Sequence, residues 1–577
     1  MARKVNVSIE IDGRNIAPIA HLSLQQPLNG HHSLELRCPI QERDRLLFNA
    51  GDYCGKEIKI EINAGSGRAG IKNLFKGFIT GVSLSKTQGG SNEVIYYGNS
   101  PSVMMDDGPH NQSFAEKNLD KIVKEITSKY NISAKSAASN TSGIPYVTQY
   151  RESSFRFISR LANQYGEWFF YDGQQLIFGK APSDSPIELV FGRDLFNFDL
   201  ALNLMPTKFK WQAYNPLNHK YPESASASAK ITGMDDYGKK ILTASENFFS
   251  NETSITTPFE VQDKSELEAL VLHNRSAKAG NIVICNGSSD NFVLKTGSII
   301  SIKGSIGDAL NAPKDITYGD FRIINITHST DSLGNYQNHF KAIPAGLGEP
   351  PVNPFVTLPI CEPQQAEVLE NHDPEGMGRV RVQFPWQKSN NEKTPWIRQA
   401  APGSGGGYGY YYVPEKGDQV FIAFEHNNPD KPYVLGGLYH GKAKPKDASD
   451  ADNNKKILQT KSGNKILLDD SGTIEIISGA NTIILTKGKI TIKTDGDFEL
   501  SAKNIKLDAS ENLTLLGATV SLEGNDTTLS GKTTNTVKSP SMTIEGETTI
   551  SMSGGIIDIT AQTIANIKAN AMLNLNS

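Results

Sequence analysis

The sequence is short of the residues that stabilise small secreted domains or bind metals through thiolates. Its 577 residues include four cysteines, and no two of them have CxxC spacing. This scarcity argues against a disulfide scaffold and a cysteine zinc site, and it is typical of a reducing compartment. No run of 18 apolar residues is present, so we expect no segment that spans a bilayer. The N-terminal segment MARKVNVSIEIDG has no apolar core, so we expect no Sec-type signal peptide.

An excess of charge of either sign is also missing. The chain has 58 lysines and arginines against 62 aspartates and glutamates, which gives a formal net charge of −4. Without a basic field, neither nucleic acid nor an anionic membrane surface is an expected partner. The length predicts several domains rather than one.

The C-terminal part, residues 462–577, has no histidine, no cysteine, one aromatic residue (Phe498) and one proline (Pro540). It consists of short apolar pairs whose first members are 7 to 9 residues apart. The pairs are Ile474/Ile476, Ile483/Leu485, Ile490/Ile492, Phe498/Leu500, Ile505/Leu507, Leu513/Leu515 and Val520/Leu522. The period of two within each pair predicts strands with one buried face, and the intervening small polar residues suit tight turns.

This repeat is too short for a chain that folds alone. A step of about 7 to 8 residues holds one strand and one corner, whereas a single chain closing three faces needs about 20 or more residues per turn. The repeat would leave open edges and a half-covered apolar face, which recruit other chains. We therefore expect three copies to wind around one axis as an intertwined triple-stranded β-helix, or β-prism, that forms a needle.

Upstream, strand patterns dominate and predict a mainly β, multi-domain fold. The alternation at 57–62 indicates a barrel strand, and the helical spacing at 119–126 indicates a buried helix face. Further helices are expected at 154–165, ending at Gly166, and at 264–274. The expected divisions are a first barrel at 1–100, an α+β insert at 101–186, a second barrel at 187–350, an OB-fold barrel at 360–441, a connector at 442–461 and the needle at 462–577.

The expected OB-fold region contains a series of motifs that resembles a known family. Residues 371–386 read NHDPEGMGRVRVQFPW, followed by WIR at 396–398, PEKGDQV at 414–420, FEHNNPDKP at 424–432 and GGLY at 436–439. This succession resembles the OB-fold neck of the VgrG family, the spike proteins of bacterial type VI secretion systems. That family is similar to the hub and needle proteins of contractile phage tails fused in one chain.

Motifs on both sides extend the resemblance to nearly the whole chain. Residues 150–166 and 328–344 resemble the helical signature and closing strands of the family's hub, and 462–470 resemble the entry into its needle. The chain departs from the family in having no Val-Gly repeat in the needle. No toxin or enzyme domain of the kind that some members carry is expected after Asn570.

The resemblance implies a non-enzymatic homotrimeric spike with no cofactor. Residues 1–350 would form a hub with two β-barrels that docks on a hexameric, Hcp-like tube protein within a baseplate. Contraction of a sheath would drive the spike, with effectors or adaptor proteins and a PAAR-like tip protein, through a target cell envelope. The protein would assemble in the cytoplasm and be expelled through the machine. A spike of a phage tail or an extracellular contractile particle is the alternative, and a carbohydrate-active, tailspike-like fibre is a more distant one.

The end of the needle is the expected docking platform for a tip protein. The last histidine is His440, so the needle cannot supply a histidine-ligated metal at its own tip. A frayed terminus is the alternative interpretation. The expected partner-binding residues are Met572, Leu573, Asn574, Leu575, Asn576 and Ser577.

Other motifs are interpreted as structural, and no catalytic, cofactor-binding or metal-binding residue is expected. Residues 65–70 match GxGxxG without a following helix, and the glycine-rich residues 403–409 lack a Gly-Lys-Ser/Thr continuation, so neither predicts a nucleotide site. Asp373 and Glu375 fit a turn better than a glycosidase pair.

The upstream histidines are likewise interpreted as structural. His31 and His32 are expected on a surface loop, and His328 is expected to pack near the end of a strand. No G-x-S-x-G sequence marks a nucleophile elbow.

Overall fold

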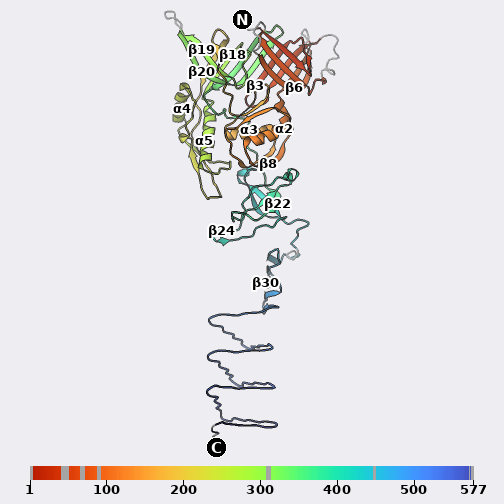
Figure 1. The fold of residues 1–577 in the computed structure, drawn as a ribbon, viewed down its shortest axis with the longest axis vertical. Coiled ribbons are helices and arrows are strands. Elements are labelled where there is room, and N and C mark those ends of the chain that lie inside the picture. The colour runs from red at the N-terminus through yellow and green to blue at the C-terminus, as the bar shows by residue number, and fades with distance from the viewer. Residues whose placement is uncertain are drawn as a thin grey trace. The chain divides into compact units, whose positions relative to one another are not determined.

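The computed structural model describes residues 4–40, 51–64, 72–86, 92–306, 314–445, 450–570 and 572 (Figure 1). The chain divides into two compact units, Met1–Asp447 and Ala448–Ser577, each of which is described by itself. Strands make up 38% of the structure and helices 13%, so the protein is mainly β, as the sequence predicts. In the described part of the chain, no helix combines the length and the apolarity needed to cross a bilayer.

The first barrel is built from antiparallel strands whose apolar residues alternate toward the interior. The strands are β1 (Val5–Ile11), β2 (Arg14–Asn15), β3 (His21–Pro27), β4 (Ser33–Pro39), β5 (Glu57–Ala64), β6 (Lys72–Ser85) and β7 (Glu93–Asn99). They follow the order β3-β4-β7-β6-β5-β1-β2. Ile9, Ile58 and Phe75 are buried between them, so the alternation in the sequence produces the core.

The second barrel shares a strand with the first. Its strands are β13 (Ile187–Val190), β14 (Leu195–Leu202), β18 (Val283–Ser289), β19 (Ile299–Ile306), β20 (Lys314–Asp331) and β21 (Tyr336–Pro344). The first part of β20 pairs with β19, and its last part pairs with β3 of the first barrel. One sheet of 13 strands therefore runs through both barrels.

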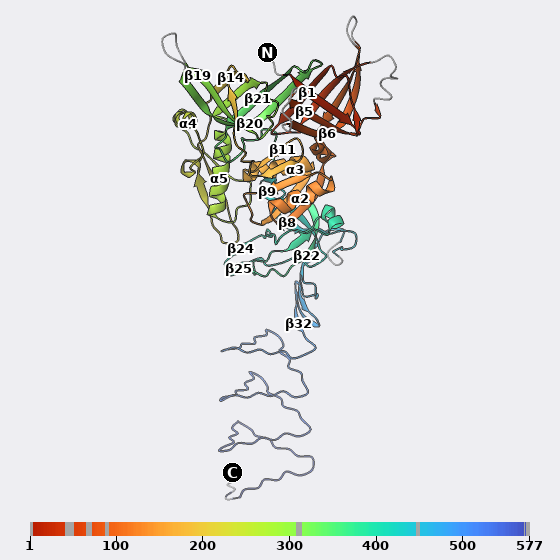
Figure 2. The ribbon, with the colours of Figure 1, turned by 45° about the horizontal axis from the view of Figure 1, so that its top comes forward.

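A mixed α+β segment follows the first barrel (Figure 2). Its elements are η1 (Pro101–Asp106), β8 (His110–Lys117), α2 (Leu119–Lys129), β9 (Ala134–Ala137), β10 (Ile144–Glu152), α3 (Ser154–Tyr165), β11 (Trp168–Tyr171) and β12 (Leu176–Gly179). Both predicted helices are confirmed as α2 and α3. Helix α3 ends as expected at Gly166, whose φ of 70° lies in the left-handed region that glycine adopts without strain.

A second mixed segment interrupts the second barrel. It contains β15 (Phe209–Gln212), β16 (Glu223–Ala225), η2 (Ser226–Ser228), α4 (Asp236–Phe248), β17 (Thr253–Thr256) and α5 (Lys264–Ala279). The sequence predicts one helix here, which is α5, and misses α4. The buried residues of α4 are Gly238 and Ser245, and beside them Ile241 and Leu242 pack, partly buried, against the core of the second barrel.

The third domain of the first unit is a small barrel. Its elements are β22 (Gln364–Glu370), β23 (Arg381–Gln383), η3 (Pro385–Asn390), β24 (Ser404–Gly405), β25 (Tyr408–Gly409), β26 (Gln419–Phe424), η4 (Glu425–Asn427) and β27 (Pro432–Gly437). The main sheet has the order β23-β22-β26-β27. Isolated bridges from Ile397 to Val380 and from Gln399 to Val434 connect its two ends around a buried apolar core.

The second unit begins as a meander of consecutive antiparallel strands. They are β28 (Lys455–Gln459), β29 (Lys465–Asp469), β30 (Thr473–Ser478), β31 (Asn481–Leu485) and β32 (Ile490–Lys493). Strand β28 lies in the stretch that was expected to be a connector. Residues 494–570 are all described, and none of them belongs to a strand.

Candidate functional site: the C-terminal strip and the junction of the first unit

The meander of the second unit presents one apolar face that no other described residue of this unit covers. Cross-strand pairs place Ile466, Ile476, Ile483 and Ile492 in one row across four strands. The exposed fractions of the large apolar residues on this face lie between 38% and 69%. These residues are Leu458, Ile466, Leu468, Ile474, Ile476, Ile483, Ile490 and Ile492. A contiguous exposed apolar surface of this kind marks an interaction site.

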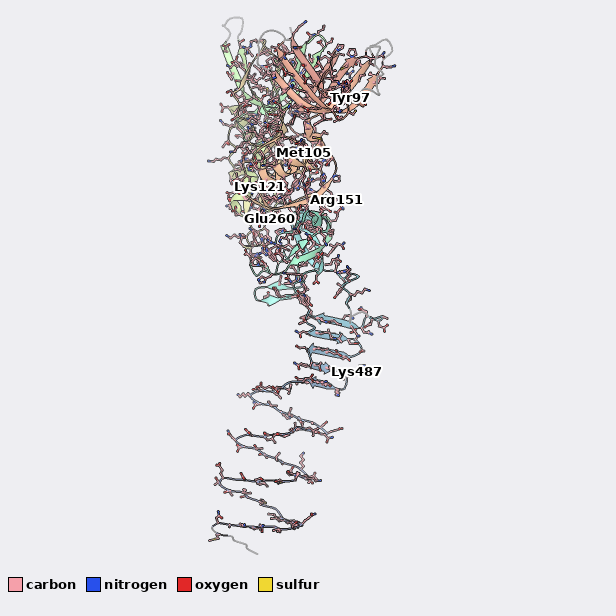
Figure 3. All side chains as sticks on the ribbon, turned by 45° about the vertical axis from the view of Figure 1, so that its right-hand side comes forward. Tyr97, Met105, Lys121, Arg151, Glu260 and Lys487 are labelled. Atoms are coloured by element: carbon pink, nitrogen blue, oxygen red, sulfur yellow. The ribbon has the colours of Figure 1, made fainter. Side chains whose placement is uncertain are left out.

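The remainder of the repeat, residues 494–570, has neither a core nor a ladder. Its large apolar residues remain exposed, from 49% for Ile550 to 92% for Leu516. Figure 3 shows sparse side chains along open turns of this segment, in which successive passes of the chain do not pack together. Extended backbone needs hydrogen-bond partners as well as apolar cover. We refer to residues 455–570 as the strip.

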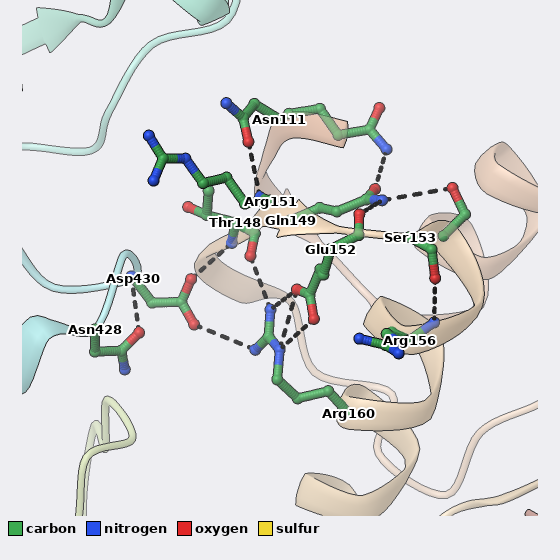
Figure 4. A network of polar contacts seen from close by, with 12 residues as sticks. Asn111, Thr148, Gln149, Arg151, Glu152, Ser153, Arg156, Arg160, Asn428 and Asp430 are labelled. Carbon is green, nitrogen blue, oxygen red and sulfur yellow. Dashed lines mark hydrogen bonds and ion pairs between the residues drawn. The ribbon is translucent and has the colours of Figure 1, made fainter. Parts of the chain in front are cut away.

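Within the first unit, a buried ionic network joins the α+β segment to the small barrel (Figure 4). Arg160 of α3 has a side chain that is 3% exposed. Its Nη2 donates to Glu152 Oε1 at 2.7 Å and to the carbonyl of Thr148 at 2.8 Å. Its Nη1 lies 3.8 Å from Oδ2 of Asp430, which comes from the small barrel. The backbone N–H of Thr148 donates to Asp430 Oδ1 at 2.7 Å, so one carboxylate holds two elements of the α+β segment.

Burial disfavours the charged forms of the two carboxyl groups in this network. Burial raises the pKa of Asp430 to about 6, although the attraction of Arg160 opposes that shift. Burial also raises the pKa of Glu152. Removing one partner of a buried ion pair leaves an uncompensated buried charge, which is strongly destabilising. The network therefore ties the position of the small barrel to that of α3.

Further contacts complete this junction, by which we mean the surface between β8, β10, α3 and the small barrel. Glu392 accepts hydrogen bonds from the N–H and the hydroxyl of Ser113 at 2.6 and 2.8 Å. Gln387 donates to the Ser113 hydroxyl at 2.8 Å and to the Tyr146 hydroxyl at 3.2 Å. Tyr150 is buried in the apolar cluster of the small barrel itself. The junction is thus a packed and hydrogen-bonded interface between the α+β segment and the small barrel.

Known proteins resemble this chain in the same order of domains. The phage tail baseplate hub (GPD) family matches residues 27–312, and the type VI secretion system/phage-baseplate injector OB domain family matches residues 364–439. The type VI secretion system spike protein VgrG1b of Pseudomonas aeruginosa is 23% identical over 319 residues, which cover 51% of this chain and 42% of that protein. The chain belongs to the VgrG family. It is a hub and spike component of a type VI secretion or phage-type baseplate.

The curated VgrG relatives are longer than the matched regions. The chain spans less than half the length of each of them. The actin cross-linking toxin VgrG1 of Vibrio cholerae is 25% identical over 196 residues, which cover 30% of this chain and 17% of that protein. The family is thus one of structural hub and spike proteins, in which one relative is named as a toxin.

Solved structures share the VgrG fold with this chain. The Escherichia coli c3393 protein, a component of the type VI secretion system, has a TM-score of 0.50 at 16% identity and covers 74% of this chain and 99% of its own. A chain of the PdpA–VgrG complex has a TM-score of 0.52 at 11% identity and covers 85% of this chain and 98% of its own. These matches support the fold.

The motifs that the sequence offered for other chemistry are accounted for as follows. Residues 65–70 lie outside the described residues. Residues 403–409 form the β24–β25 hairpin. Asp373 accepts from Arg379 Nε at 2.9 Å and from Nη2 at 2.7 Å, and this hydrogen bonding lowers its pKa. It also accepts from the backbone N–H of Glu375, which agrees with a turn rather than a catalytic pair.

The prediction for the first histidine pair is wrong for one of its members. His31 is partly buried, with a side chain that is 17% exposed, and contacts Asp106 through Nε2 at 2.8 Å. His32 is fully buried between the rings of Phe75 and Tyr171, because β4 begins at the next residue and turns it inward. His328 is buried near the end of β20, as expected.

The contacts of His328 are hydrogen bonds within the core. His328 contacts the Tyr336 hydroxyl at 2.6 Å and Gln26 Oε1 at 3.1 Å. Across the described ranges, no group of three or more His, Cys, Asp or Glu side chains is arranged to hold a metal ion.

The predicted tip residues lie at the end of the strip. Met572 is 73% exposed. Leu573, Asn574, Leu575, Asn576 and Ser577 lie outside the described residues. The junction residues Arg160 and Asp430 are the functional residues that the sequence did not assign, although both lie in motifs of the family resemblance.

Proposed function

We propose that this chain is a homotrimeric, non-enzymatic spike of a contractile injection machine. The strip carries this proposal, because a stable chain does not leave a row of isoleucines and a backbone without ladder partners in water. Two further copies supply both the apolar cover and the hydrogen-bond partners. The strips of three copies then form the intertwined triple-stranded β-helix expected from the repeat, which serves as the needle.

This architecture suits a mechanical task. In an interchain ladder, each strand pairs with neighbours from other copies, so opening one strand breaks pairs on both of its sides. Burying one isoleucine side chain contributes about 1.5–3 kcal/mol, and the strip offers such a residue at every strand. Cooperative pairing of this kind resists local unfolding when the needle is driven through a target cell envelope.

The remaining partners follow from the family. The two barrels form the hub that docks on an Hcp-like hexameric tube within the baseplate, and the small barrel forms the neck. The exposed end at Met572 and the residues after it receive a PAAR-like tip protein. Effectors or adaptor proteins travel on the spike, as the PdpA–VgrG complex suggests for a relative. The protein assembles in the cytoplasm and is expelled to the exterior or into a target cell.

The oligomeric mass of the full chain tests this proposal. Native mass spectrometry at micromolar concentration is expected to give three times the chain mass of 62.9 kDa. A monomer under native conditions would falsify the trimeric spike.

A phage tail or an extracellular contractile particle is a second candidate setting for the same spike. It is supported by the match to a family that is described as a phage tail baseplate hub. The neighbouring genes distinguish the two settings. A membrane-anchoring complex indicates a type VI system, and capsid genes indicate a phage.

A further inference from the structure

The small barrel carries an aromatic arm that has little cover of its own. Residues 403–412, which we name the tyrosine arm, form a hairpin whose strands β24 and β25 have two residues each. Gln399 anchors its base by donating to the carbonyl of Tyr412 at 2.8 Å. Tyr408 is 78% exposed and Tyr411 is 81% exposed. Aromatic residues held in water on a glycine-rich hairpin are typical of a contact surface.

A cleft with complementary chemistry opens at the edge of the junction. It has a volume of about 460 Å³ and is lined by residues of both the hub and the small barrel. We name it the junction cleft, and its principal lining residues are Tyr214, Leu217, Gln262, Arg381, Trp396 and Arg398. Its volume is in the range of sites that enclose a guest of several non-hydrogen atoms.

The lining of the junction cleft favours a neutral aromatic guest. The guanidinium of Arg381 lies 5.0 Å from the ring centre of Trp396, and that of Arg398 lies 5.5 Å from the ring centre of Tyr214. Arg381 Nε is buried and has no hydrogen-bond partner among the described residues. Guanidinium planes and aromatic faces bind the ring of a tyrosine, and an unpartnered N–H can donate to its hydroxyl.

An anionic guest fits the junction cleft less well, because each of its arginines already has a carboxylate partner. The pairs are Arg379 with Asp373, Arg381 with Glu370, and Arg398 with Glu425. Glu116 and Glu260 add further acids to the lining. The cleft thus has no unpaired cation among these arginines to attract an anion.

The tyrosine arm does not fill the junction cleft of its own chain. None of its residues lines the cleft. Tyr411 leans instead on the backbone at Gly378, where a Cβ would lie 3.2 Å from its ring. Tyr410 stacks on Tyr412 with ring centres 6.0 Å apart. With its base anchored and these rings engaged, the arm is built to project from its own domain.

We propose that the tyrosine arm of one copy occupies the junction cleft of the next copy around the threefold axis. This inference rests on the proposed trimer and assigns it a second interface, in addition to the strip. A contact between two different surfaces of one chain is heterologous, and three such contacts close into a ring. Each arm then bridges the hub and the neck of its neighbour, since both line the cleft.

Disulfide trapping between differently tagged full-length chains tests the contact. Tyr408→Cys is placed in a tagged chain and Leu217→Cys in an untagged chain, both with Cys54→Ser, because Cys54 is the exposed native thiol. A disulfide forms only when the two Cα atoms lie about 4.4–6.8 Å apart. After co-expression and mild oxidation, a covalent tagged–untagged dimer is expected on a non-reducing gel.

The matched control replaces Leu217→Cys by Phe248→Cys, at an α4 position that is 70% exposed and does not line the cleft. The control pair is expected to lose the covalent dimer, although its thiol is at least as accessible. All four substitutions are at exposed positions, so each variant is expected to keep the melting temperature of the parent.

The remaining outcomes separate this inference from the trimer itself. A native mass of three chains without the covalent dimer overturns the arm contact and leaves the trimeric spike in place. A cross-link that forms only within one chain carrying both substitutions also overturns it. A monomeric native mass overturns both proposals.

Discussion

The first unit and the strip use apolar residues in opposite ways. In Met1–Asp447 the large apolar side chains form closed clusters, and Ile11, Ile58 and Val434 have no exposed surface. In the strip, isoleucines with the same strand alternation remain largely exposed. The difference lies in strand length and connection, because longer strands and cross-connections let one chain close a barrel, whereas a short repeat cannot. The first unit encloses its own apolar clusters, whereas the described residues of the strip leave an apolar face exposed.

The largest effect is expected from introducing charges into the apolar face of the strip. Ile476→Asp combined with Ile483→Asp places two carboxylates in the row that the other copies are proposed to bury. Because an unpaired buried charge costs several kcal/mol, the trimer is expected to dissociate. Native mass spectrometry measures the loss, and the circular dichroism of the first unit should persist.

Asn481→Asp is the matched control for the charged strip. It adds a carboxylate at an exposed position at the start of β31, where Asn481 pairs with Ser478 at the edge of the face and not with an isoleucine of the row. The trimer is expected to survive this change. A trimer that also survives the double substitution would show that the apolar face is not an interface between copies.

The junction should respond to substitution as the interior of one folded body. Arg160→Ala leaves Glu152 and Asp430 buried without their cation. We expect the free energy of unfolding of the first unit to fall by about 3–5 kcal/mol, as measured by denaturant unfolding.

Arg151 lies nine residues before Arg160 in the sequence and forms an exposed ion pair with Glu362, with 3.2 Å between Nη1 and Oε1. Arg151→Ala removes this pair. It should leave the unfolding curve nearly unchanged, since exposed pairs contribute little. If Arg160→Ala and Arg151→Ala changed the free energy of unfolding equally, the junction would not be a buried interface.

The two buried histidines of the first unit should each lower its stability in mild acid, while the raised pKa of Asp430, about 6, acts in the opposite direction. Burial lowers the pKa of His32 and of His328 from 6.5 to about 3. The unfolded chain therefore binds protons below pH 6.5 that the folded chain does not bind. Each histidine is expected to cost about 2 kcal/mol between pH 7 and pH 5. The stability that each neutral histidine contributes is present above pH 6.5 and is lost as the pH falls below it.

His32→Phe isolates one of these contributions. The ring stays between Phe75 and Tyr171, and two buried nitrogens without partners among the described residues are removed. The variant should be at least as stable as the parent at pH 7 and lose about 2 kcal/mol less on going to pH 5. An unchanged pH dependence would contradict the buried, neutral state of His32.

The smallest structural effect is expected at the tip. Removing residues 572–577 should change neither the native mass nor, by more than about 0.5 kcal/mol, the stability of the spike, because the removed segment is terminal. Binding of a PAAR-like tip protein should be lost, as measured by pull-down with the full chain as the control. Retained binding would place the docking platform elsewhere.

Periodicity predicted the elements whose buried face is continuous. Helices α2 and α3 were found because Ile122, Val123, Phe157 and Leu161 recur on one face. Helix α4 was missed because its inward face mixes Gly238 and Ser245 with the partly buried Ile241 and Leu242, which leaves a short apolar stripe. The burial of His32 was missed because one residue at the start of a strand has no local pattern that indicates its side.

The junction shows what local patterns cannot contain. Residues 150–166 and 424–432 were recognised as family motifs, but their relation to each other was not. Ser113 and Glu392 form a contact across 279 residues of sequence, and Thr148 and Asp430 form one across 282. Charge type and motif identity do not specify which distant partner a side chain meets.

By itself, the sequence determined the mainly β class, the order of the domains, the short repeat of the strip and the membership in a spike family. These features depend on the spacing of residues that are close together in the sequence, so sequence patterns can predict them. Only the tertiary structure decided that one sheet runs through both barrels, that Arg160 and Asp430 join hub to neck, and that His32 is buried. These depend on contacts between residues far apart in sequence, which form only when burial and hydrogen bonding are satisfied together.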